Sequence, residues 1–243
     1  MNDILCRQLA LDYCCSEEDV RDDKDHFMIY RPLEGRRRFH NDDECFLKVA
    51  VINNKVLYAG KEQIIEWCRE HYKIPGGEWF FEADNLRPLN DKLHSEGKKI
   101  KFVHPFYISS VRSEVSTDGL DIKWYENGEL ERFSGDDRFG EALAFCEEAP
   151  DMIAVTANSG GRIIGMAGAS CDSPTMWQIG INVDNSARGS GIGKTLVALL
   201  KNEVLERGKL PFYGTSMSHI ASQRVALGAG FLPAWAELAV SEL

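Results

Sequence analysis

The sequence predicts a mixed α/β protein in two parts: an N-terminal α+β region and a C-terminal mixed, mostly antiparallel sheet with flanking helices. The first observation is length, because 243 residues can hold two domains of roughly 100–150 residues each. The second is the change of pattern near Ser110, after which hairpin signals lead into a strand–helix–strand–helix succession. The third is a glycine-rich turn between a strand and a helix at 184–195. We therefore expect domains at 1–110 and 111–243.

The N-terminal region reads as short alternating helices and strands. Apolar residues recur at helical spacing in two of its segments, and Asn53 and Asn54 separate two apolar runs as in a tight hairpin. Gly97 closes another helical stripe. The expected elements are helices over 4–13, 61–72 and about 86–96, and strands over 46–52, 55–59 and 100–103. No catalytic constellation is recognisable in this region, so its role is left unassigned.

The C-terminal region begins as a meander of strands. Asn127 and Gly128 suit the primed turn of a hairpin, and Gly160 and Gly161 mark a second hairpin. Between them, residues 138–148 carry an amphipathic helical pattern. The expected strands are 122–125, 130–133, 152–157, 163–169 and 177–183, followed by a helix over 191–207, a strand over 211–215, a helix over 219–229 and a strand over 235–240.

Composition and charge exclude several classes of function. A formal net charge of −10 argues against a nucleic-acid partner or an anionic membrane, and favours an amine or a cationic acceptor. No apolar run is long enough to cross a bilayer and the first residues do not resemble a signal peptide, so we expect a cytoplasmic protein without a membrane partner. The seven cysteines never occur as CxxC, which indicates reduced, mostly buried thiols and no metal site.

The run Arg36, Arg37 and Arg38 leaves two interpretations open. It could form a local anion patch. A solvated loop with acidic neighbours is the interpretation that we prefer.

The glycine-rich turn carries the chemistry. Gly189, Gly191 and Gly193 let the backbone approach a ligand, and the first amides of the following helix lack intrahelical partners. These amides, the positive end of the helix dipole and the charge of Arg188 together favour a phosphate. The spacing fits neither G-x-G-x-x-G nor the nucleotide-binding P-loop, and glycines that serve only a tight turn remain the alternative.

The segment from Arg188 to Gly193 resembles the R/Q-x-x-G-x-G/A motif of the GNAT superfamily of N-acetyltransferases, as does the order of elements around it. The resemblance covers about the last hundred residues. It extends to Ser222, Val225, Gly230 and Phe231 near the end. It departs from the family at two positions, where His219 replaces the usual asparagine and Ala226 the usual tyrosine.

The resemblance implies acetyl-CoA as co-substrate, with no metal. The pyrophosphate of CoA would lie on the turn, and the pantetheine would pair like an extra strand with backbone groups near Ile181 and Val183. Ser222 would lie near the pantetheine arm. The expected turn contacts are Arg188, Gly189, Ser190, Gly191, Ile192, Gly193, Lys194 and Thr195.

Catalysis is less well defined. In this family an amine attacks the thioester directly, so a base takes a proton and an acid can protonate the thiolate. Ala226 cannot transfer a proton. His219 and Tyr213 are the local candidates, although His219 can equally cap a helix and Tyr213 can equally pack in the core; water-mediated proton loss is a further alternative.

Three functions therefore stay open. The favoured one is acetylation of a primary amine on a small molecule or peptide. The second is an acyl-CoA-binding regulatory or structural module without turnover, and the third is a protein acetyltransferase whose N-terminal part recognises a partner. After Phe231 there is room for one strand of about five or six residues, which would leave the C-terminal sheet with an open edge. We expect the N-terminal domain to cover that edge, with a homodimer as the alternative.

Overall fold

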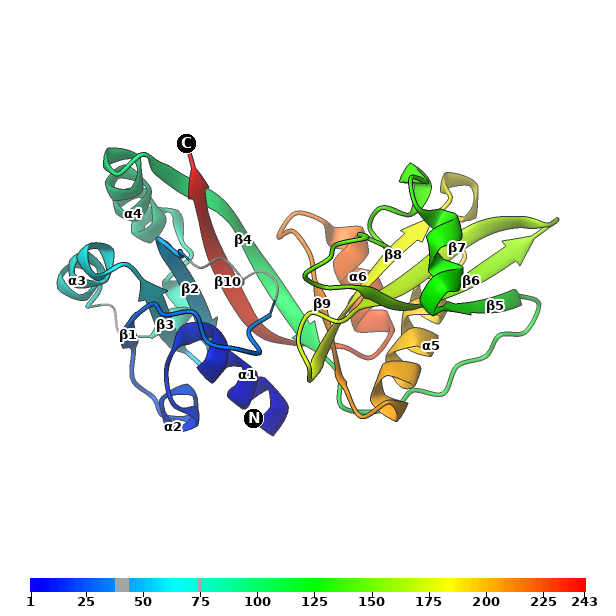
Figure 1. Cartoon of the computed structure of the whole chain (residues 1–243), viewed down its shortest axis with the longest axis horizontal. Coiled ribbons are helices and arrows are strands. Elements are labelled where there is room, and N and C mark those ends of the chain that lie inside the picture. The colour runs from blue at the N-terminus through cyan, green and yellow to red at the C-terminus, as the bar shows by residue number, and fades with distance from the viewer. Residues whose placement is uncertain (38–43, 74–75) are drawn as a thin grey trace. The chain divides into compact units, whose positions relative to one another are not determined.

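The computed structural model describes residues 1–37, 44–73 and 76–243, which fall into two compact units (Figure 1). Unit 1 comprises Met1–Phe106, Thr215–Ser218 and Pro233–Leu243, and unit 2 comprises Tyr107–Gly214 and His219–Leu232. The first change of unit lies close to the expected boundary near Ser110. The last strand, which we expected in the C-terminal part, is grouped with unit 1 instead.

Unit 1 is built on a five-stranded sheet with the order β1-β3-β2-β10-β4. Its strands are β1 (His26–Ile29), β2 (Leu47–Ile52), β3 (Lys55–Gly60), most of β4 (Lys98–Ile108) and most of β10 (Leu232–Glu242). Its helices are α1 (Asp3–Tyr13), α2 (Glu17–Arg21), α3 (Glu62–His71), α4 (Ala83–Ser95) and the short 3₁₀ turn η2 (Gly77–Trp79). The expected helices and strands of this region are confirmed, and β4 is longer than expected.

The β2–β3 hairpin turns where the two asparagines predict it. Asn53 and Asn54 have φ of 46° and 65°, the left-handed values that this residue type tolerates. Strand pairing runs from Leu47↔Gly60 to Ile52↔Lys55 without a shift. The two-residue turn therefore sets the register of the whole hairpin.

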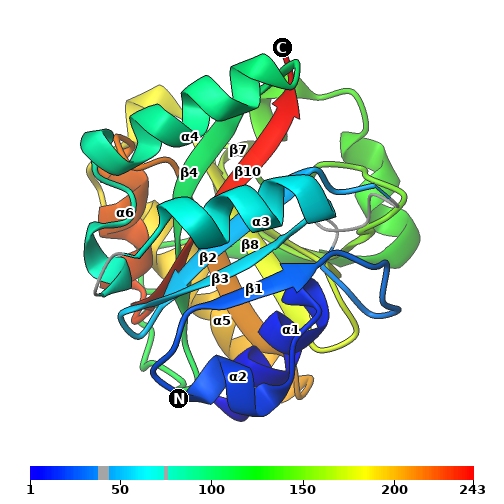
Figure 2. The same cartoon turned by 90° about the vertical axis from the view of Figure 1, so that its left-hand side faces the viewer.

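The two faces of the unit 1 sheet have different chemistry. Helices α3 and α4 pack over one face, as Figure 2 shows, and meet an apolar cluster that includes Leu47, Val49 and Leu238. Because side chains alternate along a strand, Lys48 points to the other face, toward Tyr13 of α1. One face of this sheet is therefore an ordinary apolar core, and the other buries charge.

The last strand differs from expectation in length and in neighbours. β10 has 11 residues, about twice the expected length, and its residues Ala236–Ala239 pair antiparallel with Val51–Lys48 of β2. It lies between β2 and β4 in the sheet order. The expectation that Trp235–Val240 forms a strand of the C-terminal domain is therefore wrong, since its apolar residue Leu238 completes the core of unit 1.

Unit 2 contains a second run of strands with the order β9-β8-β7-β6-β5. Its strands are β5 (Asp121–Glu126), β6 (Asp151–Ser159), β7 (Arg162–Ser170), β8 (Met176–Val183) and β9 (Leu210–Gly214). Its helices are α5 (Ile192–Glu206), α6 (Ile220–Gly228) and the 3₁₀ turns η3 (Asn127–Phe133), η4 (Asp137–Phe139) and η5 (Asn185–Ala187). The pairs β5–β6, β6–β7 and β7–β8 are antiparallel and β8–β9 is parallel, so the mixed, mostly antiparallel sheet is confirmed.

The expected hairpin at Asn127 and Gly128 is wrong. Asn127 has a positive φ of 50°, but it begins the η3 turn rather than a reversal of β5. The side chains of Leu130 and Phe133, three residues apart, are both buried in the same apolar cluster. Burial of this pair competes with a strand, and β5 takes β6 as its partner instead.

The expected helix over 138–148 is also wrong. Its apolar residues Phe139, Ala142 and Leu143 are buried as predicted, but the chain is helical only over Asp137–Phe139. Phe145 has a φ of 48°, which an α-helix cannot contain. The backbone amides of Glu141 and Ala142 also donate hydrogen bonds to the side chain of Asn182. These bonds hold the segment on the sheet as a loop.

Candidate functional site

The glycine turn lies between β8 and α5, as predicted. Gly189 and Gly191 have φ of 82° and 88°, in the region that residues with a Cβ rarely adopt. A Cβ added at either position would meet no atom within 4 Å. Both glycines are therefore required for backbone conformation, and the space in front of them is open to a ligand.

The first turn of α5 offers free backbone donors. Gly191 is the N-cap residue and supplies no side-chain cap, and the first intrahelical bond runs from Thr195 N to Gly191 O at 3.0 Å. The amides of Ile192, Gly193 and Lys194 precede that bond and face the helix terminus. An uncapped helix N-terminus after two left-handed glycines is the geometry that the turn needs to bind an anion.

The side chains of the turn hold its shape. Ser190 Oγ donates to Ala187 O at 2.6 Å, and Arg188 Nε donates to Val183 O at 3.3 Å while the residue stays exposed. Asp184 Oδ1 accepts from Ser186 N at 3.0 Å. These bonds keep the turn compact and leave the other guanidinium nitrogens of Arg188 for a ligand.

Gly193 has a different role from the other two glycines. It is buried, and an added Cβ would lie 3.3 Å from Val183 Cγ2 and 3.5 Å from Val225 Cγ2. Its missing side chain lets α5 begin close against β8 and α6. Gly193 and Ile192 therefore face a ligand with their backbone amides, because the side chain of Ile192 is buried in the core.

Strand β8 separates from β9 after its third residue, Gln178. Their parallel ladder covers Met176↔Leu210, Trp177↔Pro211 and Gln178↔Phe212, whereas β8 continues to Val183. Both strands lie wholly within the described residues, and 179–183 has no ladder partner on β9. The backbone of Ile181 and Val183 therefore has an open side that leads directly into the glycine turn.

A loop segment that contains Glu141 and Ala142 is held by hydrogen bonds on the face of β8 that carries Gly180 and Asn182. Asn182 Oδ1 accepts from Glu141 N at 3.0 Å and from Ala142 N at 2.8 Å. Two glycines that pair across β7 and β8, Gly168 and Gly180, give room for this segment, because an added Cβ would lie 2.1 Å and 1.7 Å from the carbonyl oxygens of Ala142 and Glu141. We had not predicted this clamp; its sequence signal is a polar Asn182 beside a strand glycine.

Tyr213 and Ser222 meet near the point where the strands separate. The Tyr213 hydroxyl and Ser222 Oγ lie 2.8 Å apart, and Phe212, the residue before Tyr213, makes the last pair with β8. Burial raises the pKa of the Tyr213 phenol, the Ser222 hydrogen bond lowers it and the charge of Glu141 raises it, with a net increase. The phenol therefore stays protonated at neutral pH, and its ring packs in the core against Phe231.

His219 and Ala226 occupy contrasting positions on α6. His219 is the exposed N-cap residue and makes no side-chain cap bond. Ala226 is fully buried in the core of unit 2, on the same inner face as Ser222, four residues earlier. A tyrosine in place of Ala226 would have to displace core side chains, so the hydroxyl near this helix comes from β9 instead.

Charge is buried in unit 1, where we expected a solvated arginine loop. Arg37 is 0% exposed; its Nε donates to Asp12 Oδ2 at 2.5 Å and its Nη2 to Glu237. Burial alone would lower the pKa of Arg37, but the charges of Asp12 and Glu237 raise it above its ordinary value. The solvated-loop interpretation is therefore wrong at Arg37; Arg38 lies outside the described residues.

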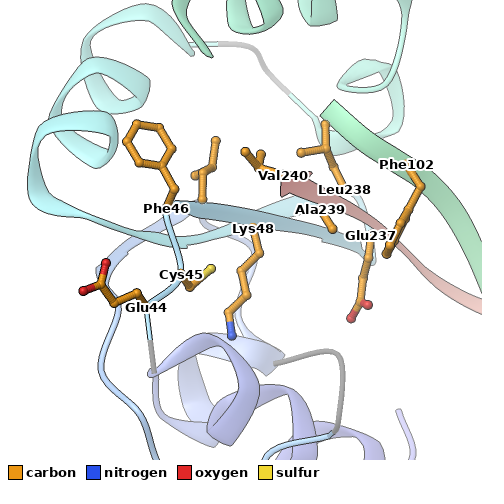
Figure 3. Close-up of a pocket in the computed structure, with 10 residues that line it drawn as sticks. Glu44, Cys45, Phe46, Lys48, Phe102, Glu237, Leu238, Ala239 and Val240 are labelled. Carbon is orange, nitrogen blue, oxygen red and sulfur yellow. The ribbon is translucent and has the colours of Figure 1, made fainter. Parts of the chain in front are cut away.

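A cavity of about 70 Å³ lies beside this network (Figure 3). Lys48 and Glu237 point to the same side of the sheet in that view. Lys48 is buried, its Nζ lies 4.5 Å from the Tyr30 ring centroid, and no described residue accepts a hydrogen bond from it. Burial lowers the pKa of Lys48. Lys48, Arg37 and Glu237 thus form a buried polar interior of unit 1.

Other potential sites in the described residues are weak. Asp19, Asp22 and His26 have ligand atoms within 4.8 Å of one another, but Lys55 Nζ already donates to Asp22 Oδ1 at 2.8 Å. The ammonium group of Lys55 therefore already supplies a positive charge to these carboxylates.

All seven cysteines are free thiols, of which Cys6, Cys14 and Cys68 are buried. No helix in the described ranges is both long and apolar enough to span a membrane.

The fold and the site of unit 2 together define a class. A mixed sheet whose strand β8 opens on one side, beside a glycine turn and an uncapped helix, is suited to a ligand with an extended arm and a phosphate end. Residues 120–231 match the acetyltransferase (GNAT) family. The C-terminal part of the chain therefore belongs to the GNAT superfamily.

Several solved structures are similar to parts of this chain. A GCN5-related N-acetyltransferase-like protein from Streptococcus suis 89/1591 has a TM-score of 0.50 and 13% sequence identity over 87% of this chain and 89% of its own. That likeness supports the fold alone. A GCN5-related N-acetyltransferase from Kribbella flavida shares 16% identity over 62% of each chain with a TM-score of 0.46. An aminoglycoside N-acetyltransferase in complex with CoA shares 27% identity over 46% of this chain and 91% of its own, with a TM-score of 0.35. No curated protein matches the chain.

Proposed function

We propose that this protein transfers the acetyl group of acetyl-CoA to a primary amine of a small-molecule or peptide acceptor. The observation that carries the proposal is the separation of β8 from β9 after Gln178, directly before the glycine turn and the uncapped start of α5. An open strand edge can hydrogen-bond an amide-containing arm, and an uncapped helix end can bind a diphosphate. Pantetheine and the diphosphate of CoA supply those two groups in that order.

In this proposal the chain binds the two ends of CoA separately. Backbone groups of Ile181 and Val183 pair with the pantetheine amides. Amides at 189–194 and the guanidinium of Arg188 bind the diphosphate, with the side chains of Ser190, Lys194 and Thr195 around them. Ser222 lies beside the arm, where its bond to Tyr213 orients the phenol.

The acetyl transfer then requires that the attacking amine loses one proton and that the departing thiolate gains one. The neutral amine attacks the carbonyl carbon, the new C–N bond forms, and the C–S bond breaks to release a thiolate. We propose Tyr213 as the acid that protonates this sulfur, because its hydroxyl lies beside Ser222 and the residue directly follows the last residue of β9 that pairs with β8. The attacking amine loses its proton to water or to His219, whose exposed ring at the start of α6 is accessible to solvent.

Two substitutions at Gly191 test the proposed binding mode. Asn and Asp have the same size and both tolerate a positive φ, so Gly191→Asn and Gly191→Asp should destabilise the fold to a similar extent. Only Asp adds a negative charge in front of the helix terminus. We expect CoA to bind Gly191→Asp at least about tenfold more weakly than Gly191→Asn, by titration calorimetry.

Turnover is tested with the parent protein. Thiol release from acetyl-CoA in the presence of a panel of amines should exceed release without amine. CoA binding without turnover on any amine would favour an acyl-CoA-binding module instead. Equal CoA affinities of the two Gly191 variants would place the diphosphate elsewhere and refute the binding mode.

A further inference from the structure

A depression lined by arginines adjoins the glycine turn in unit 2. It has a volume of about 410 Å³, which is in the range of small-molecule sites. Arg138 of η4, Arg162 at the start of β7 and Arg188 of the turn line it, together with Asn182 and Asp184. It lies along the β7 side of the end of β8, whereas the open strand edge faces the β9 side.

The charges of this depression contrast with the rest of the chain. The sequence has a net charge of −10, yet three guanidinium groups meet here with one carboxylate in the lining, that of Asp184. Arg138 Nη2 lies 2.6 Å from Asp136 Oδ2, and Arg162 pairs with Asp184. The Arg138 and Arg162 side chains are 55% and 64% exposed, so both can turn toward a ligand in the depression.

Asp184 is committed to the turn. Its Oδ1 accepts from Ser186 N at 3.0 Å and from Ser186 Oγ at 2.7 Å, and these bonds lower its pKa. Asp184 therefore stays ionised, and its ion pair with Arg162 keeps that guanidinium next to the glycine turn. The depression thus keeps an excess of positive charge next to the anion-binding backbone, and Arg188 belongs to both.

We propose that Arg138 and Arg162 bind the 3′-phosphate of CoA and make the protein discriminate CoA from its 3′-dephospho form. The inference rests on the proposed function, which places the diphosphate on the glycine turn. The ribose of CoA follows the diphosphate on the side away from pantetheine, and its phosphate needs donors beyond the turn. Guanidinium groups suit a phosphate because they donate two parallel hydrogen bonds to its oxygens.

The test compares the affinities for CoA and for 3′-dephospho-CoA by titration calorimetry. The parent protein should bind CoA at least about tenfold more tightly than 3′-dephospho-CoA. Arg138→Ala and Arg162→Ala should each reduce this ratio, and the double variant should bring it near one. The affinity for 3′-dephospho-CoA should hardly change in any of them.

Arg112→Ala is the matched control. Arg112 is 61% exposed and pairs with Glu206 at 3.2 Å, so this variant also removes one exposed, ion-paired arginine, but beside the last residue of α5 rather than its first turn. Its affinity ratio should equal that of the parent.

The outcomes separate the two proposals. A parent protein that binds neither compound would refute the proposed function. If the parent binds both compounds equally, or if the double variant keeps the parental ratio, this inference is wrong while CoA binding stands.

Discussion

A methyl group at position 180 would collide with the loop that is clamped to β8. An ideal Cβ there lies 1.7 Å from Glu141 O and 2.8 Å from Glu141 C, and both are backbone atoms. Ordinary contact begins at 3.4 Å, so the Glu141 carbonyl would have to retreat by about 1.7 Å. A shift of that size breaks the two bonds from Glu141 N and Ala142 N to Asn182 Oδ1.

The cost of Gly180→Ala follows from these two effects. Two lost hydrogen bonds cost about 2 kcal/mol, and overpacking against backbone adds about 1–3 kcal/mol. We therefore expect the free energy of unfolding to fall by about 3–5 kcal/mol, measured by urea denaturation. Gly128→Ala is the matched control: an added Cβ there meets nothing within 4 Å, and a change within about 0.5 kcal/mol is expected.

A double-mutant cycle identifies the mechanism. Asn182→Ala removes both bonds without a clash and should cost about 2 kcal/mol. Since Gly180→Ala already breaks those bonds, the double variant should be only slightly less stable than Gly180→Ala alone. Additive costs, or a Gly180→Ala protein within about 1 kcal/mol of the parent, would show that the loop does not rest on this glycine.

The other predictions concern the phenol of the site and the buried charges of unit 1. Tyr213→Phe should lower kcat far more than Ser222→Ala, although both lose the same hydrogen bond and about 1 kcal/mol of stability; equal kcat values would exclude the phenol as the acid. Arg37→Met should cost about 3–5 kcal/mol because it leaves two buried carboxylates without their guanidinium, and adding Asp12→Asn and Glu237→Gln should recover most of that loss in denaturation experiments. Burial lowers the pKa of Lys48, so between this lowered pKa and 10.5 the unfolded chain binds more protons than the folded chain. The parent should therefore gain stability relative to Lys48→Met as the pH rises through this window toward 10.5; a stability difference that stays constant with pH would mean that Lys48 is not desolvated.

Local patterns predicted the regular elements well where one signal dominated. Asn53 and Asn54 predicted a hairpin because both tolerate a left-handed backbone. Asn127 and Gly128 carry a similar local signal, but burial of Leu130 overrides it. A turn signal indicates where the chain can bend, whereas the partner of the next segment decides whether a hairpin forms.

The turn of the candidate site was predictable, and the surroundings of the turn were not. The conformations of Gly189 and Gly191 follow from glycine's freedom at positive φ. The clamp by Asn182 depends on a loop about 40 residues earlier, and no local pattern connects the two. The sequence did not predict the burial of Arg37, because its partners Asp12 and Glu237 lie near opposite ends of the sequence.

The place of β10 has a consequence for synthesis on the ribosome. β10 is translated after every other strand of unit 1, yet it lies between β2 and β4 in the sheet. While residues 107–232 emerge, β2 and β4 still lack the neighbour that belongs between them, and unpaired strand edges of this kind invite wrong partners. Unit 2 can therefore complete its core before unit 1 does, although it begins later in the sequence.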